Sequence, residues 1–414
     1  MRPVLRLEVI VVMRPAKTIT PAATILLAVI MLVAACAPQR QVPWRPTQPT
    51  APVTPPAMAM QPKAALLLPL TGPAAAVGQD LLDAAQMALF DAGDNQLELM
   101  PFDTGSEPDG ATVAARAAIA SGANVIIGPL FGRSTVAVTP LATSAGVEVF
   151  SLSNDSSVAR PGIWVMGFGP EQQVDRVVRF AAQTGVNRMA ALAPADAFGT
   201  RAIQAFQRAV GATGTARIVD IATYDASNST PTDAVGRVAT GLGVGPATEG
   251  GALSAPDSAV LIADGGARLR AVASLLAYHD IDPRSVRHLG TSRIQDDAAA
   301  LLDPQLQGTW FAGAPPEGAE EFATRFRSLF NRSPSSVALL AYDTTAMVAG
   351  QSRAGPLDPA AFLDSQGFVG RAGIFRLLPD GRTERGLAVL EVNQGTAQVV
   401  DPAPLTFREQ FAAR

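Results

Sequence analysis

After residue 63, the apolar and polar positions of the chain alternate between short apolar runs and longer stretches with helical spacing. Residues 64–70 form a continuous apolar run that ends in Thr71-Gly72-Pro73, and such a run is typical of a strand buried on both faces of a parallel sheet. Further apolar residues recur at helical spacing and stop before Gly93, which predicts an amphipathic helix over 80–92. The pattern therefore begins with a strand followed by a helix.

The same order of strand and helix repeats along two successive series of residues. Parallel strands joined through a helix have right-handed crossovers and a sheet covered by helices on both faces. The pattern predicts an α/β fold of two lobes, each a parallel sheet with helices on both faces, and a ligand cleft at the carboxyl ends of the strands. The further elements predicted are strands at 97–102, 125–127, 147–150, 189–193, 218–224 and 258–262, and helices at 109–120, 134–145, 172–184, 197–210 and 268–278.

Two stretches depart from this alternation. Residues 241–256, GLGVGPATEGGALSAP, are rich in glycine and predict a surface insertion. The apolar stretches 373–378 and 387–392 flank Asp380-Gly381, a pair typical of tight turns. We therefore expect these two stretches to form a β-hairpin.

The residues before Cys36 are typical of a secretion signal. Arg14 and Lys17 precede an apolar run over 25–33, which is too short for a comfortable membrane span. The four residues 33–36, Val-Ala-Ala-Cys, resemble a bacterial lipobox, in which the cysteine thiol accepts diacylglycerol. We expect residues 1–35 to be a lipoprotein signal peptide and Cys36 to carry the lipid. The alternative is an ordinary membrane anchor with a coincidental cysteine.

Two further expectations concern this end of the chain. Translation can start at Met1 or at Met13, because the signal features all follow Met13. Ala37 follows the cysteine where lipoproteins of the inner membrane usually carry aspartate, so the lipobox resemblance implies a periplasmic protein anchored in the outer membrane. Residues 38–62 contain eight prolines and no acidic residue, which predicts a Pro-rich tether over 36–62 that forms no core.

Composition and charge exclude several classes of function. The chain has 414 residues, 48% of them hydrophobic, and a net charge of −4, so we expect no nucleic acid as a partner of this acidic protein. A single cysteine and two histidines, His279 and His288, provide no zinc site of paired cysteines and no HExxH spacing. No GxSxG motif or P-loop occurs, so we expect no enzyme, no metal and no cofactor.

Several segments resemble those of type I periplasmic binding proteins of the leucine/isoleucine/valine-binding class. The segments are KAALLLPLTGPAAAVGQDLLDAAQMALFDAG, NVIIGPLFGRSTVAVTPLATSAGVEVFSLS, ADAFGTRAIQAFQRAV and LIADGGARL. The resemblance implies that the chain crosses between lobes three times, near Gly167, Gly313 and Gln366. The resemblance also implies that lobe 1 consists of residues 63–166 and 313–365, that lobe 2 consists of residues 167–312 and 366–400, and that residues 401–414 form a C-terminal tail.

A narrower resemblance combines the lipobox, the Pro-rich spacer, this fold and the ending GFVGRAGIFRLLPDGRTERGLAVLEV. The combination is similar to proteobacterial penicillin-binding protein activator lipoproteins, which implies regulation of peptidoglycan synthesis by contact with a penicillin-binding protein. The helical-repeat domain of the best-known members is absent, because residues 38–62 are too few to form it. The alternative is a substrate-binding lipoprotein of an ABC transporter for branched-chain or other amino acids.

If the cleft binds a small molecule, the resemblance implies that its loops bind the ligand carboxylate. Backbone N–H groups at a helix N-terminus and nearby hydroxyls favour an anion. Arg133 and Phe131 stand where small polar residues are expected, and the guanidinium either fills the space or recruits a larger anion. Ser134 is either a ligand contact or a helix N-cap. The candidates in this lobe are Thr71, Gly72, Gly78, Gly128, Phe131, Arg133, Ser134, Thr135, Ser151, Ser153 and Asn154.

A ligand ammonium would need an acidic partner from the opposite lobe. Asp196 and Asp264 hold that position in the resemblance, although each is equally explained as a turn or cap aspartate. Phe198 either closes over a ligand or fills the interface between lobes. The sequence leaves the occupant of the cleft open.

Overall fold

The computed structural model describes residues 61–93, 96–227, 230–243 and 257–407. The expected signal peptide, the lipidated Cys36 and nearly all of the tether lie outside the described residues. Most of the expected insertion over 241–256 and half of the C-terminal tail, residues 408–414, lie outside them as well.

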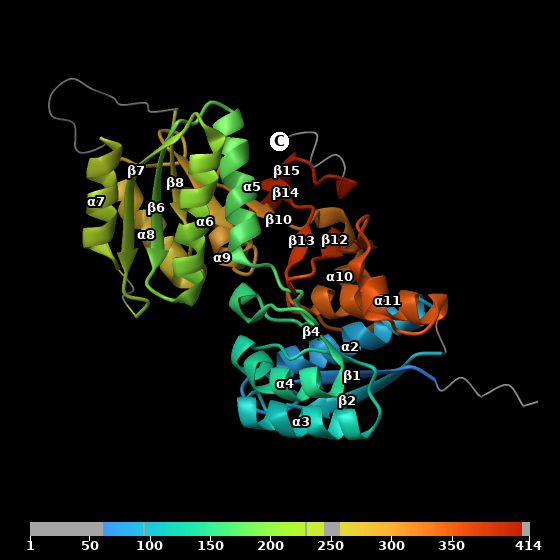
Figure 1. The fold of residues 1–414 in the computed structure, drawn as a ribbon. Helices are drawn as coiled ribbons and strands as arrows, with labels where there is room; N and C mark the ends of the chain where they lie inside the picture. Colours follow the sequence, from blue (N-terminus) through green and yellow to red (C-terminus); the bar gives the residue numbers. More distant parts are fainter. Residues whose placement is uncertain (1–60, 94–95, 228–229, 244–256, 408–414) are drawn as a thin grey trace, which may run out of the picture. The chain divides into compact units, whose positions relative to one another are not determined.

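Five parallel strands form the first sheet, here called sheet A, in the order β2-β1-β3-β4-β5 (Figure 1). On β1, alternate residues Ala64, Leu66 and Leu68 face a core shared with α2 and α11. Ala65 and Leu67 face the core shared with α3 and α4. The apolar run of β1 is therefore buried on both faces, as predicted. The strands are β1 Lys63–Leu68, β2 Glu98–Asp103, β3 Val125–Ile127, β4 Glu148–Ser151 and β5 Ile163–Val165, and the helices are α2 Ala75–Asp91, α3 Pro108–Ala120, α4 Gly132–Ala145, α10 Pro316–Phe330 and α11 Ala338–Ala354.

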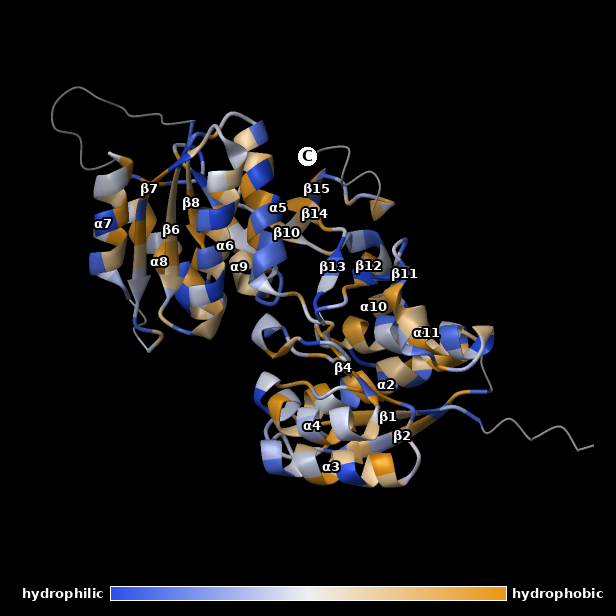
Figure 2. Ribbon diagram, in the orientation of Figure 1, coloured by the Kyte–Doolittle hydropathy of each residue, from blue (hydrophilic) through white to orange (hydrophobic). Residues whose placement is uncertain are grey.

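Seven strands form the second sheet, here called sheet B, in the order β15-β14-β10-β9-β8-β6-β7. Strands β7 to β10 run parallel to β6, and β14 is antiparallel to both β10 and β15. Helices α5 and α6 cover one face, while α7, α8 and α9 cover the other; Figure 2 shows hydrophilic residues along α5. The helices and strands of this part are α5 Pro170–Gln183, β6 Arg188–Pro194, α6 Ala197–Thr213, β7 Arg217–Tyr224, α7 Thr232–Leu242, β8 Ser258–Ile262, α8 Gly266–Tyr278, β9 Arg287–Thr291, α9 Ala298–Leu302, β10 Trp310–Gly313, β14 Ala388–Asn393 and β15 Thr396–Asp401. Short 3₁₀ turns elsewhere along the described chain are η2 Ser156–Val158, η3 Ser292–Ile294, η4 Pro304–Leu306 and η5 Pro359–Leu363.

The expected hairpin between 373–378 and 387–392 is wrong in its second strand. The turn at Asp380-Gly381 is present, but β12 Gly373–Leu377 pairs with the short β13 Thr383–Arg385 and with β11 Phe368–Gly370 in a small sheet C. Residues 388–393 instead pair with β10 in sheet B. The apolar side chains of 388–393 are buried in the core of sheet B, which explains why they do not remain beside β12.

Two helices depart furthest from the prediction. Helix α2 begins at Ala75 and not at residue 80, because the apolar spacing does not mark its alanine-rich first turn. Helix α7 was not predicted, and it extends to Leu242, inside the stretch expected to be an insertion. Five of its residues, among them Val235 and Val238, are buried against sheet B. Within the described residues, no helix is both long enough and apolar enough to cross a membrane.

Candidate functional site

The carboxyl ends of the parallel strands of sheet A meet at one edge, where the loops after β1, β2, β3 and β4 lie together. Thr71 Oγ1 donates to Asp103 Oδ2 at 2.6 Å, and Ser106 Oγ donates to the carbonyl of Thr71 at 2.9 Å. Slight burial raises the pKa of Asp103, but hydrogen bonds from Thr71, Gly105 and Leu70 outweigh it and lower that pKa. Thr71 therefore joins the first two loops to each other.

The three glycines predicted for the cleft keep backbone segments close together. A Cβ at Gly78 would lie 2.1 Å from the carbonyl oxygen of Pro69, and one at Gly128 would lie 2.3 Å from that of Leu67. Gly128 and Gly72 also have φ angles of +100° and +83°, which side chains rarely tolerate. These positions require glycine for packing and backbone conformation.

Helix α4 begins at this edge without a side-chain cap. Its N-cap residue is Phe131, so Ser134 is the third residue of the helix and the N-cap interpretation of Ser134 is wrong. Ser134 is 1% exposed, and its hydroxyl has no hydrogen-bond partner within the described residues. The unpaired hydroxyl lies in the first turn of a helix, where free N–H groups favour an anion.

The hydroxyls of the next two loops are used internally. Thr135 Oγ1 lies 2.7 Å from Ser151 Oγ and 3.1 Å from the carbonyl of Phe131. Ser151 and Thr135 are fully buried, and Ser153 Oγ accepts from the N–H of Asp155 at 3.0 Å. Asn154 is exposed. The structure thus brings Thr135, Ser151 and Ser153 together as a network that joins β3 to β4.

Asp155, which sequence reasoning missed, lies at the start of α4. A Cβ at Gly132 would come within 3.1 Å of Asp155 Oδ2, so the carboxylate of Asp155 stands against the first residue of the helix. Arg133 does not enter this space. Its side chain is 61% exposed, and it donates to the carbonyl of Ser106 at 3.2 Å, with its guanidinium carbon 5.6 Å from the ring of Phe131.

The two aspartates expected to face a ligand ammonium are already engaged. Asp196 accepts from the N–H of Gly199 at 2.7 Å and caps α6. Asp264 is 1% exposed; it accepts from Tyr224 Oη at 2.6 Å and from Arg268 Nη2 at 2.9 Å. Burial and the bond to Asp264 raise the pKa of Tyr224. Asp196 is therefore a helix cap, and Asp264 is a buried partner of Tyr224 and Arg268.

A group of charged side chains, here called the ionic clasp, connects the carboxyl edges of the two sheets. Arg201 in α6 places Nη1 2.9 Å from Asp155 Oδ1 and Nε 3.4 Å from Glu171 Oε1. Ser156 Oγ donates to the same Glu171 oxygen at 2.5 Å. The Nε of Arg201 makes no hydrogen bond within the described residues, so Asp155 is its stronger partner. Arg201 is only 15% exposed, and the clasp sets the loop after β4 against the first turn of α6.

Arg293, also missed, lies at the carboxyl edge of sheet B. It follows β9, and its guanidinium carbon stands 4.8 Å from the ring centroid of Phe198, which follows β6. Gly265, after β8, leaves room for it, because a Cβ there would lie 3.0 Å from Arg293 Cβ. Within the described residues, the guanidinium of Arg293 has no ion pair and no hydrogen bond.

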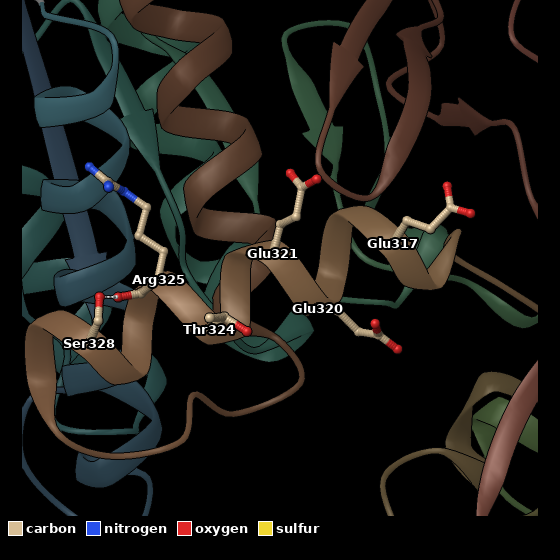
Figure 3. Close-up of a pocket in the computed structure, with 6 residues that line it drawn as sticks. All are labelled: Glu317, Glu320, Glu321, Thr324, Arg325 and Ser328. Atoms are coloured by element: carbon tan, nitrogen blue, oxygen red, sulfur yellow. Dashed lines mark hydrogen bonds between the residues drawn. The ribbon is translucent and has the colours of Figure 1, made fainter. Parts of the chain in front are cut away.

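A shallow hollow elsewhere on the molecule does not resemble the candidate site at the carboxyl edges of the sheets. It follows the surface of α10 and is lined by Glu317, Glu320, Glu321, Thr324, Arg325 and Ser328. Figure 3 shows Glu320 and Glu321 on different sides of the helix, and Glu321 pairs with Arg371. No group of three acidic, histidine or cysteine side chains in the described part of the chain could hold a metal ion.

Comparison with known proteins matches the chain to one family over most of its length. The profile described as periplasmic binding protein matches residues 61–397. An uncharacterised protein of Rickettsia prowazekii (strain Madrid E) is 28% identical over 116 residues, which are 28% of this chain and 31% of that protein. The match therefore spans less than a third of that relative.

Two solved structures share the fold. A putative branched-chain amino acid ABC transporter protein from Rhodospirillum rubrum has a TM-score of 0.69 at 19% identity, covering 82% of this chain and 99% of that chain. A solute-binding protein of an ABC transporter from Rhodopseudomonas palustris BisB5, in complex with 3,4-dihydroxybenzoic acid, has a TM-score of 0.61 at 20% identity, covering 83% of this chain and 96% of that chain.

Proposed function

Because the chain belongs to the periplasmic binding protein family, we propose that it captures a small solute between the carboxyl edges of sheets A and B and delivers it to an ABC transporter. Family membership implies a periplasmic location. The observation that carries the proposal is the ionic clasp, since the 2.9 Å contact between Asp155 and Arg201 sets the two edges against each other. Ligands of parallel α/β sheets bind at such edges.

The proposal includes movement about the segments that connect the sheets. We propose that the chain crosses near Gly167, Gly313 and Gln366, with lobes of 63–166 plus 313–365 and 167–312 plus 366–400. Support comes from the segment between β5 and α5, where the carbonyl of Met166 accepts from Arg385 and the N–H of Arg385 donates to Gln172 Oε1 at 2.8 Å. When two lobes rotate about a hinge, only a few hydrogen bonds in the connecting segments need to change.

Thermal unfolding with candidate solutes tests the proposed function. A ligand that binds only the folded protein at 100 times its dissociation constant stabilises the protein by about 2.7 kcal/mol. We expect at least one member of a panel of amino acids, organic acids, amines and sugars to raise the melting temperature of the full-length protein. An unchanged melting temperature across the panel at millimolar concentration would contradict solute capture.

A second function, regulation of a peptidoglycan synthase by contact, is favoured by one observation in sheet C. Val369 is 87% exposed on β11, an edge strand, in the segment that resembles the penicillin-binding protein activators. An exposed apolar edge strand is suited to pairing with another chain. We expect the wild-type protein to retain a purified penicillin-binding protein, and we expect the Val369→Glu variant not to retain it. Equal retention by wild type and variant would remove this support.

We further propose that Cys36 carries the lipid and that the protein is anchored in the outer membrane. The support is the sequence Val-Ala-Ala-Cys over 33–36, with Ala37 after it. Mass spectrometry of protein from the native membrane should find diacylglycerol on Cys36. Cys36→Ala should release the protein from the membrane fraction, and a variant that stays with the outer membrane would contradict the anchor.

A further inference from the structure

We propose that the solute is a small organic anion with an apolar body and without an ammonium group, and that Arg293 on sheet B binds its anionic end. This inference rests on the proposed solute-binding function and names the class of ligand for that site. The inference rests on the charged side chains at the carboxyl edges of the two sheets.

At the edge of sheet A, an internal carboxylate already stands at the start of α4. Asp155 Oδ2 lies within 3.1 Å of where a Cβ of Gly132 would be, and Asp155 Oδ1 pairs with Arg201 at 2.9 Å. A helix N-terminus favours an anion, and Asp155 provides it from the chain itself. A ligand carboxylate at the same place would meet the like charge of Asp155, so this edge is a poor anchor for it.

The edge of sheet B offers a cation, Arg293, for which the described residues provide no ion pair within 4.0 Å. The guanidinium carbon of Arg293 lies 4.8 Å from the centroid of the Phe198 ring, and Gly265 leaves room for the Arg293 side chain. Asp296, three residues after Arg293, shares a hydrogen bond with Ser336; this bond and the charge of Arg293 lower its pKa, while desolvation raises it by more. A guanidinium that stacks over an aromatic ring keeps its N–H donors for other partners, and these donors can bind a carboxylate in bidentate fashion.

Within the described residues, four carboxylates near the two edges already have partners. Asp196 caps α6, and Asp264 is buried between Tyr224 and Arg268. Glu171 and Asp155 are engaged by Arg201 and Ser156. The ammonium of an amino acid would lie beside the cations Arg201 and Arg293 with none of these four carboxylates free to neutralise it. This desolvated contact between like charges disfavours the binding of an amino acid. The ring of Phe198 offers apolar surface next to Arg293 for the body of the ligand.

Matched ligand pairs test the inference, since 4-methylpentanoate is leucine without its ammonium group and 3-phenylpropionate is phenylalanine without it. We expect calorimetric titration of the full-length protein to show each carboxylate binding at least tenfold tighter than its amino acid and than its neutral amide. Arg293→Met should weaken the carboxylates at least tenfold, and Arg293→Lys should retain most of their affinity. Arg293→Glu should reverse the order in favour of the corresponding amines.

Arg208→Met is the matched control, because Arg208 is exposed on the same helix as Arg201, away from the loops, and it should change no affinity. Amino acids that bind at least as tightly as the matched carboxylates, or carboxylates unaffected by Arg293→Met, would overturn the inference and leave the proposed function standing. Failure of every carboxylate, amino acid, amine and sugar to bind the wild type, while its melting curve stays cooperative, would overturn both.

Discussion

Gly78 shows how a single residue sets the distance between a helix and the loop before it. It lies inside α2, and a Cβ there would be 2.1 Å from the carbonyl oxygen of Pro69, so Gly78→Ala must push α2 from the edge of sheet A. We expect a loss of about 1–3 kcal/mol of unfolding free energy, measured by denaturant titration. Gly211→Ala in α6, with nothing within 4 Å of the added Cβ, should be neutral or stabilising by up to about 1 kcal/mol. Equal losses in both variants would contradict this view of Gly78.

His288 makes the stability of the protein depend on pH. It is fully buried in β9, and burial lowers its pKa to about 4 although a backbone hydrogen bond with Ile281 acts in the opposite direction. The unfolded chain therefore takes up the proton first, near pH 6.5. Stability is fully present above that pH and falls as the pH drops from about 6.5 to 4, by up to about 3 kcal/mol.

Denaturant titrations at pH 7 and pH 4.5 measure this effect. His288→Leu should reduce the difference in unfolding free energy between the two pH values. His279→Gln, at the end of α8, is the control and should keep the wild-type difference. A difference that persists unchanged in His288→Leu would show that other groups cause it.

At the scale of elements, the ionic clasp joins α6 to the loop after β4, and its energy can be isolated. Arg201 is 15% exposed and Asp155 is 30% exposed, so solvent screens the pair only in part. A double-mutant cycle of Arg201→Met and Asp155→Ala should give a coupling of about 1 kcal/mol in unfolding free energy. The same cycle for the exposed pair Arg382 and Asp380 should give a smaller value. A clasp coupling near zero would mean that the contact does not hold the edges together.

Much of the element order was predictable, because buried strands of parallel sheets leave continuous apolar runs. Strands β3 and β8 have the predicted ends, 125–127 and 258–262. The hairpin failed because local turn residues at Asp380-Gly381 fix the turn but not which distant strand pairs with 388–393. Helix α7 failed because its glycines and threonines hide a buried apolar stripe of Val235, Val238 and Leu242.

The candidate site was predictable in position and less so in chemistry. Parallel strand ends place Thr71, Ser134 and Ser153 at one edge, as the pattern indicated. Tyr224, which donates to Asp264, lies 40 residues from it, and Asp155 lies 46 residues from Arg201, so no spacing rule reveals these two contacts. Arg293 had no motif of its own, and the strand before it, Arg287–Thr291, has the sequence RHLGT, which is too polar to be predicted from an apolar run.

At the scale of the whole molecule, the central claim is that a solute binds where the carboxyl edges of sheets A and B meet. Hydrogen–deuterium exchange of the full-length protein, with and without saturating 4-methylpentanoate, tests it most directly. We predict slower exchange in peptides covering 128–135, 196–201 and 291–294, and no change in α10 or β11. Protection confined to α10 or β11, or no protection at a concentration that saturates binding, would contradict the claim.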